Sequence, residues 1–315
     1  MTPRMGWIKH GRIFHVDGQF EWMMHYANMP TPDLLDDGRV RIYFGARDAA
    51  GQTRPGFIEA DAREPETVPF VHDRPALDLG KLGTFDDSGA TPSCLVTVGA
   101  TKYLYYVGWN RRVTVPYSLA IGVAVSTEGG SAFTRVFEGP VVDRTAEEPH
   151  LATAPFVLLE NGVWRMWYVS GTGWIEVDGH PEPLYEVKYA ESADGFSWRR
   201  DNITCIAPRS PTEAIARPWV VREGSTYRMW YCYRGSVGYR NDPRESYCIG
   251  YAESGDGIRW QRKDEEAGIG VSASGWDSQM IEYPSVYQHE GTTHLLYNGN
   301  GFGESGIGHA ALETG

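Results

Sequence analysis

The sequence predicts an all-β protein with the architecture of a five-bladed β-propeller, each blade being a four-stranded antiparallel sheet. Five related segments recur along the 315 residues, and each contains a proline, a short apolar run, a turn and an aromatic strand. The five prolines, spaced 60 to 66 residues apart, are Pro32, Pro92, Pro155, Pro218 and Pro284. A strand-rich repeat longer than about 40 residues is typical of propeller blades arranged around one channel.

The third copy shows the expected strands in order. The apolar run PFVLL predicts a buried first strand, and the Glu-Asn-Gly turn at 160–162 is a hairpin signal. The aromatic run VWRMWYVSG predicts the second strand. After a longer connection, YEVKYAES predicts a third strand, Asp194-Gly195 a turn and Trp198 the start of a fourth. The second and fourth copies repeat this order, and the first is more divergent.

The fifth copy ends at its third strand, GIGHAAL. The N-terminal stretch WIKHGRIF, which begins at Trp7, resembles the stretches that follow Trp198 and Trp260. We therefore expect the N-terminal strand to complete the last blade and close the ring, which removes exposed sheet edges. The chain is predicted to form one propeller domain over 1–315, with blades at 25–80, 81–143, 144–207, 208–271, and 272–315 together with 5–15.

Composition excludes several classes of protein. The net charge is −12 and there is no basic stripe, which argues against a nucleic-acid partner. No apolar run approaches 18 residues, so no membrane span is predicted, and the N-terminus lacks the apolar core of a secretion signal. The four cysteines have no CxxC spacing, so neither a disulfide nor a zinc framework is expected. A cytoplasmic protein is the expectation.

Candidate site residues follow from the propeller geometry. The segments that precede the repeat prolines, and the loops after the second strands, should converge on one mouth of the channel. These segments are rich in carboxylates, arginines, amides and tryptophans. Aromatic faces stack on sugar rings and bidentate side chains bind vicinal hydroxyls, while two carboxyl groups can supply acid and base or nucleophile across a glycosidic bond. A small-molecule sugar or glycoside is therefore the expected ligand.

Four carboxylates are candidate catalytic residues. Glu282 lies in the apolar run MIEYPSVY, where a lone carboxylate needs a partner or a raised pKa. Asp277 is either its partner or a turn residue. Glu213 lies close to Arg217 in the sequence, so a structural ion pair is the alternative. Asp87 is preferred to its neighbour because it is nearer the strand, and a loop cap is its alternative.

The candidate substrate-binding residues are polar or aromatic side chains of the same segments. They are His25, Asn28, Arg47, Asp48, Trp109, Asn110, Trp174, Arg217, Arg234, Asn298 and Asn300. Arg47 and Asp48 have an ion pair at a strand end as their alternative, and a lone histidine is more often a core residue than a ligand. Because neither metal-ligand spacing nor a phosphate-binding glycine loop is found, no metal and no other cofactor is predicted.

The blade layout, with strands such as PSVY and RMWY, resembles the five-bladed propellers of glycoside hydrolase families 32, 43, 62, 68 and 130. The segments LGTFDDSG, YYVGWN, AIARP, GWDSQMIEYP and LYNGNG look closest to an uncharacterised bacterial group described as glycosyl hydrolases or glycosylases. The resemblance covers nearly the whole chain and implies a propeller fold with a sugar-like ligand.

The chain departs from those families at the residues that carry their chemistry. Family-43 enzymes place acidic residues next to blade prolines. Here the residues before the five repeat prolines are Thr31, Thr91, Ala154, Arg217 and Tyr283, and none is acidic. Only Glu282-Tyr283-Pro284 keeps a Glu-x-Pro spacing, and the family-32 motif Asn-Asp-Pro-Asn is replaced by Asn28-Met29-Pro30.

We therefore expect a carbohydrate-active enzyme, a glycosidase or a related glycan-processing enzyme, with Glu282, Glu213, Asp87 and Asp277 sharing the acid, base and stabilising roles. A phosphorylase is a variant of this hypothesis, because arginines such as Arg234 can hold phosphate. A propeller that binds sugar without cleaving it is the first alternative. A biosynthetic enzyme that uses the pocket for other acid–base chemistry is the second.

Overall fold

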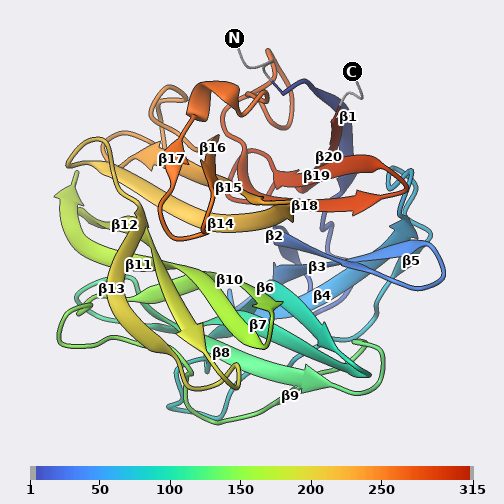
Figure 1. The fold of residues 1–315 in the computed structure, drawn as a ribbon, viewed down its shortest axis with the longest axis horizontal. Coiled ribbons are helices and arrows are strands. Elements are labelled where there is room, and N and C mark those ends of the chain that lie inside the picture. The colour runs from blue at the N-terminus through green and yellow to red at the C-terminus, as the bar shows by residue number, and fades with distance from the viewer. Residues whose placement is uncertain (1–4, 313–315) are drawn as a thin grey trace.

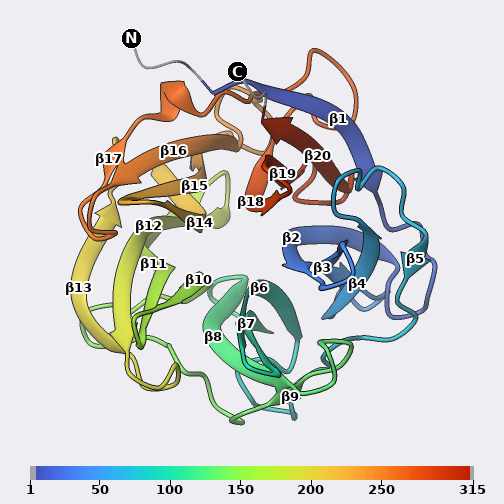
Figure 2. The same cartoon turned by 45° about the vertical axis from the view of Figure 1, so that its right-hand side comes forward.

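The computed structural model describes residues 5–312 and confirms the all-β propeller prediction (Figures 1 and 2). Within that range the chain forms twenty strands and one short 3-10 helix, Asp264–Glu266. None of its helical segments is long and apolar enough to cross a membrane. In Figure 2 the sheets surround a common centre, with β2, β6, β10, β14 and β18 innermost.

Four-stranded antiparallel groups follow one another along the chain. Their members are β2 (His25–Leu34), β3 (Arg39–Arg47), β4 (Thr53–Asp61) and β5 (Phe70–Val71); β6 (Gly89–Val98), β7 (Thr101–Arg111), β8 (Tyr117–Ser126) and β9 (Thr134–Arg135); β10 (Ala152–Glu160), β11 (Val163–Val177), β12 (His180–Ser192) and β13 (Arg199–Ile206); β14 (Glu213–Glu223), β15 (Thr226–Gly235), β16 (Cys248–Ser254) and β17 (Gln261–Arg262); and β18 (Glu282–His289), β19 (Thr292–Asn298) and β20 (Ile307–Leu312) with β1 (Trp7–Phe14). A parallel pairing of Thr53 with Gly89 joins the first two groups into one eight-stranded sheet.

The first strands of the groups contact one another around the ring, β2 with β6, β6 with β10, and so on to β18 with β2. In four groups the first strand carries a non-glycine residue at positive φ directly before a proline. These residues are Met29 (φ 56°), Ala154 (44°), Arg217 (54°) and Tyr283 (52°). Such a backbone is strained, so it persists only where the surrounding strands impose it.

This geometry corrects the alignment of the first copy. A β-bulge lies between Asn28 and Thr31, as it does between the matching residues Glu282 and Ser285 of β18. The proline equivalent to Pro284 is therefore Pro30, whereas the sequence repeat suggested Pro32. Two prolines lie two residues apart in this segment, and strand composition alone does not separate them. Asn28 consequently occupies the position that Glu282 occupies in the last group.

The N-terminal strand completes the last group, as predicted: β1 pairs antiparallel with β20. Trp7 is buried, donates from Nε1 to the carbonyl of Ala267 at 3.0 Å, and meets the ring of Trp230 edge-on at 6.2 Å. Because Trp230 belongs to β15 of the fourth group and Ala267 follows that group's last strand, β1 also fastens the last group to its neighbour.

Trp7→Ala is expected to lower the free energy of unfolding by about 3–5 kcal/mol, because it removes a large buried side chain and leaves a cavity. The neighbouring Ile8 is 52% exposed and provides the control: Ile8→Ala should change it by less than about 0.5 kcal/mol. Urea unfolding followed by circular dichroism measures both values. Equal effects of the two substitutions would contradict a fastening role for β1.

Candidate functional site

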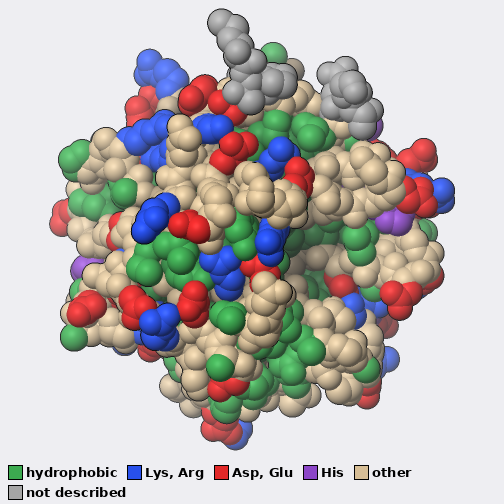
Figure 3. All heavy atoms as spheres, in the orientation of Figure 1, with side chains coloured by type: hydrophobic (Ala, Val, Ile, Leu, Met, Phe, Trp, Pro, Cys, Tyr) green, Lys and Arg blue, Asp and Glu red, His purple; other side chains and the backbone are tan. Residues whose placement is uncertain are grey.

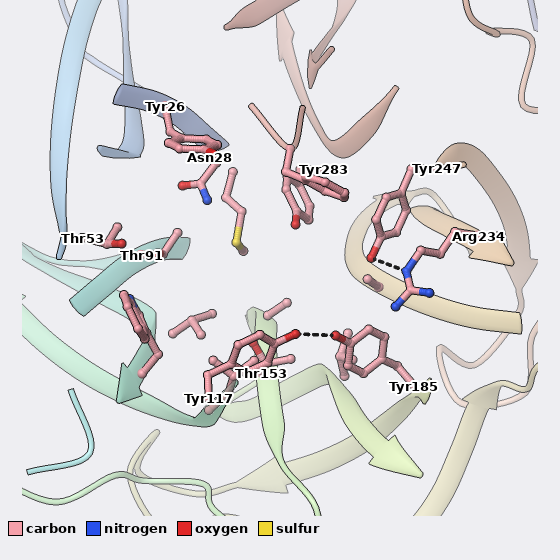
Figure 4. A pocket seen from close by; sticks show the side chains of 18 of the residues that line it. Tyr26, Asn28, Thr53, Thr91, Tyr117, Thr153, Tyr185, Arg234, Tyr247 and Tyr283 are labelled. Atoms are coloured by element: carbon pink, nitrogen blue, oxygen red, sulfur yellow. Dashed lines mark hydrogen bonds between the residues drawn. The ribbon is translucent and has the colours of Figure 1, made fainter. Parts of the chain in front are cut away.

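A cavity of about 360 Å³ lies among the inner strands, and all five strand groups contribute to its walls (Figure 4). Its lining includes Asn28 from β2, Thr91 from β6, Thr153 from β10, Arg234 from β15 and Tyr283 from β18. The other lining residues include five more tyrosines, Trp109 and Phe302. Flat aromatic faces with hydroxyl groups at their edges suit a small polar ring, and the volume lies near the lower end of ordinary ligand pockets.

Arg234 is held rigidly in the cavity wall. It is 2% exposed, and its guanidinium lies 3.8 Å from the ring centre of Tyr239. Its Nε donates to the hydroxyl of Tyr247 at 3.1 Å, Nη1 donates to Ser236 Oγ at 2.9 Å, and Nη2 donates to the carbonyl of Pro183 at 3.1 Å. No described carboxylate forms an ion pair with it. Arg234 therefore brings a fixed positive charge to the cavity.

Two more arginines line the cavity, and they differ in whether a carboxylate pairs with them. Arg240 forms a two-bonded ion pair with Glu182, at 2.7 and 3.1 Å. Arg47, at the end of β3, instead lies over the ring of Tyr26 at 4.3 Å, and its buried Nε has no hydrogen-bond partner among the described residues. The charge of Arg240 is thus balanced by Glu182, while no described carboxylate forms an ion pair with Arg47.

Glu282 stands at the start of β18, opposite Asn298 of β19. Its carboxyl group is fully buried, and neither oxygen has a hydrogen-bond partner within residues 5–312. Burial raises the pKa of Glu282 well above 4.5, and the charge of Arg234 offsets this only in part. Glu282 therefore keeps its proton well above the pH at which an exposed glutamate loses it.

Glu282 is not part of the cavity lining, but it precedes the lining residue Tyr283 in the chain. Burial raises the pKa values of Tyr247 and Tyr283, and the charge of Glu282 raises both further. Both tyrosines line the cavity, and Figure 4 shows the hydroxyl group of Tyr247 at its hydrogen bond with Arg234.

Arg217 lies outside the cavity lining, although the sequence suggested that it binds substrate. It is completely buried and donates from Nη1 to the carbonyl and hydroxyl of Ser93, at 2.8 and 2.9 Å. Its Nη2 donates to the carbonyl of Pro30 at 3.0 Å and to Thr31 Oγ1 at 3.1 Å. Burial lowers its pKa to about 10. Arg217 thus ties β14 to β6 and β2.

The other three predicted catalytic carboxylates also lie outside the lining. Asp277 pairs with Lys9 at 2.6 Å and accepts from Tyr297 at 3.1 Å. Glu213 forms a two-bonded ion pair with Arg262, both bonds 2.9 Å, rather than the expected pair with Arg217. Asp87 caps a loop, because its carboxylate accepts a hydrogen bond from the backbone N–H of Gly83 at 2.9 Å.

Of the predicted binding residues, the cavity lining contains Asn28, Arg47, Trp109 and Arg234. The remainder lie outside it, namely His25, Asp48, Asn110, Trp174, Arg217, Asn298 and Asn300. Several have structural contacts instead. Asp48 pairs with Arg54 at 2.8 Å, not with Arg47, and Asn298 accepts from the N–H of Met29 at 2.8 Å. Asn300 accepts from the N–H of Gln279 at 2.7 Å.

Sequence reasoning missed most of the tyrosines. Tyr26, Tyr117, Tyr185, Tyr239 and Tyr247 all line the cavity. Tyr239 and Tyr247 come from the connection between β15 and β16, which is longer than a tight hairpin. A long, aromatic insertion at the mouth of a propeller was the signal that could have identified them.

One group of described side chains has donor atoms close enough to hold a metal ion. Its members are His10, Glu66 and His309, whose ligand atoms lie within 4.8 Å of one another. Glu66 bonds to His309 Nδ1 at 2.8 Å and lies 3.2 Å from His10 Nδ1. None of the three lines the central cavity.

Known proteins provide a context for this arrangement. No family model matches the chain. The uncharacterized protein Rv1502 of Mycobacterium tuberculosis (strain ATCC 25618 / H37Rv) is 39% identical over 311 residues, covering 98% of this chain and all of the mycobacterial protein. Among solved structures, a glycoside hydrolase matches with a TM-score of 0.77 and 15% identity, over 99% of this chain and 93% of the other. A thermostable family-43 glycoside hydrolase matches with a TM-score of 0.65 and 17% identity, over 92% and 89%. The structural matches confirm the propeller fold of the glycoside hydrolases.

Proposed function

We infer the function from this premise: the chain belongs to the family of the Mycobacterium tuberculosis protein Rv1502, and it has the fold of the propeller glycoside hydrolases. We propose that it is a carbohydrate-active enzyme that acts on a small glycoside in the central cavity, with Glu282 as the general acid. The fold alone hosts many functions, so the proposal depends on the site.

The observation that supports the proposal is the buried carboxyl group of Glu282, which has no hydrogen-bond partner among the described residues and directly precedes the cavity-lining Tyr283 in the chain. Burial raises its pKa well above 4.5. A buried carboxyl without a partner destabilises a fold, so its presence favours a functional role. A glutamate with a raised pKa is the form that an enzyme needs to protonate a leaving-group oxygen near neutral pH.

The surrounding residues suit this role. The tyrosines bind the sugar ring and exclude water from the cavity. Tyr283 turns aside as substrate binds, and the O–H of Glu282 gives its proton to the glycosidic oxygen while the carbon–oxygen bond breaks. The carboxylate that remains is stabilised by the charge of Arg234, which already lowers the pKa of Glu282 in part.

The cavity lining has no aspartate or glutamate within residues 5–312. Glycosidases that hydrolyse usually need a second carboxylate to activate water or to form the covalent intermediate. This observation favours phosphorolysis as a second candidate, because a phosphate oxygen attacks the sugar without a general base. Arg47 would bind the phosphate, and Arg234 would add its fixed positive charge.

The test is turnover of a panel of oligosaccharides and aryl glycosides, followed by mass spectrometry with and without phosphate. Wild type is compared with Glu282→Gln, Glu213→Gln and Asp87→Asn, each checked by thermal melting. We expect turnover that only a folded Glu282→Gln variant loses, and phosphate dependence would identify phosphorolysis. Full activity of Glu282→Gln would overturn the assignment of the acid. Ligand-induced melting shifts without turnover in wild type would identify a binding protein.

A further inference from the structure

The charge of the cavity is opposite to that of the protein. The chain carries 41 acidic and 29 basic side chains, for a net charge of −12. Acidic and basic side chains are interspersed over the face shown in Figure 3. The described cavity lining nevertheless contains three arginines and neither aspartate nor glutamate. Only Arg240 of the three has a carboxylate partner, Glu182.

The two other arginines are available to a ligand in different ways. Arg234 donates to protein acceptors from each of its three nitrogens, so it acts mainly through its fixed charge. The guanidinium of Arg47 instead lies over the ring of Tyr26, and its buried Nε has no hydrogen-bond partner among the described residues. A buried donor without an acceptor is unfavourable unless a ligand supplies one.

The position of Arg47 favours a ligand with an anionic group at one end. Arg47 lies over Tyr26, and Figure 4 places Tyr26 across the cavity from Arg234. The guanidinium of arginine binds carboxylate and phosphate oxygens through paired hydrogen bonds. Distant surface carboxylates are screened, because the Debye length is about 8 Å at physiological ionic strength. The arginines of the cavity therefore dominate the field that a bound ligand experiences.

We propose that the cavity takes an acidic sugar, one that bears a carboxylate or a phosphate, and that Arg47 binds the anionic group while the tyrosines hold the ring. This inference rests on the proposed function only in that it takes the ligand to be a sugar. It adds the substrate class, since a neutral glycoside would leave both Arg47 and Arg234 without a counter-charge.

Binding is measured by calorimetry with matched probes: glucose, glucuronate, glucose 6-phosphate and inorganic phosphate alone. We expect wild type to bind at least one acidic sugar at least tenfold more tightly than glucose. Arg47→Gln should remove most of this preference, a loss of about 10- to 100-fold, and should affect glucose little. The control Arg259→Gln, at a side chain that is 92% exposed, should leave all affinities unchanged.

Each contrary result has a defined meaning. No preference for either acidic sugar over glucose overturns the proposal. Inorganic phosphate that binds as tightly as glucose 6-phosphate, without preference for glucuronate, also overturns it, because the anion is then a separate ligand. If a folded Arg47→Gln variant keeps the preference for acidic sugars, Arg47 does not bind the anionic group. A wild-type protein that selects acidic sugars but turns over no glycoside would refute the proposed enzyme function alone.

Discussion

Glu282→Gln is expected to abolish turnover and to stabilise the folded protein at neutral pH. The loss of a general acid typically lowers the rate by about 10²- to 10⁴-fold. The stability gain has a separate cause. Burial raises the pKa of Glu282 above 4.5 in the folded state, so folding takes up a proton there. Stability from this group is present below pH 4.5 and is lost as the pH rises toward the folded pKa. Glutamine does not titrate and avoids that loss.

The difference in melting temperature between Glu282→Gln and wild type should therefore grow from pH 4.5 to pH 8. Glu213 provides a control of opposite sign. Burial raises the pKa of Glu213, but its bonds to Arg262 and to the backbone of Arg209, with the charges of both arginines, together lower it below 4.5. Stability from Glu213 is present above pH 4.5 and is lost as the pH falls, so Glu213→Gln should destabilise the protein at neutral pH. A destabilised Glu282→Gln variant at pH 8 would indicate a structural role for Glu282.

Arg217→Met is expected to lower the free energy of unfolding by about 3–5 kcal/mol. Four hydrogen bonds to Ser93, Pro30 and Thr31 are lost, and each buried acceptor left without a donor is destabilising by about 1–3 kcal/mol. Relief of the buried charge offsets part of this, since burial already lowers the pKa of Arg217 to about 10.

Urea unfolding measures the effect of Arg217→Met. Arg222→Met, at a side chain that is 44% exposed, is the matched control and should change stability by less than about 0.5 kcal/mol. Arg217→Lys should recover only part of the loss, because an ammonium group cannot reach acceptors on both β6 and β2 as the guanidinium does. If Arg217→Met were as stable as wild type, the contacts of Arg217 would not be what holds the three inner strands together.

The blade repeat could be predicted from the chain because each strand group is local in sequence. The aromatic second strands and their Gly-containing turns recur at a nearly constant interval, and β1 resembles the other outer strands. Pro30 was the exception: its place in the repeat became clear only from the φ of Met29 and the bulge that follows it. The residue composition of a segment predicts the order of its strands, but it does not predict which residues of neighbouring strands pair.

The composition of the cavity was less predictable. Glu282 was identifiable because a lone acid in an apolar run needs an explanation. Glu213 and Asp277 looked equivalent to it, yet their ion partners are Arg262 and Lys9, residues from other strands or from the far end of the chain. Spacing from a proline does not reveal such partners.

The sequence by itself determined the all-β propeller and the N-terminal strand as the last strand of the fifth group, because patterns of apolar and turn residues lie within one segment of the chain. Only the tertiary structure decided that tyrosines and arginines line the cavity, that Arg217 lies outside its lining, and that Glu282 has no hydrogen-bond partner among the described residues. The physical reason is that a cavity is formed by side chains from five separate strand groups. Their distances across the ring, and hence their hydrogen bonds and pKa shifts, arise only when the ring closes.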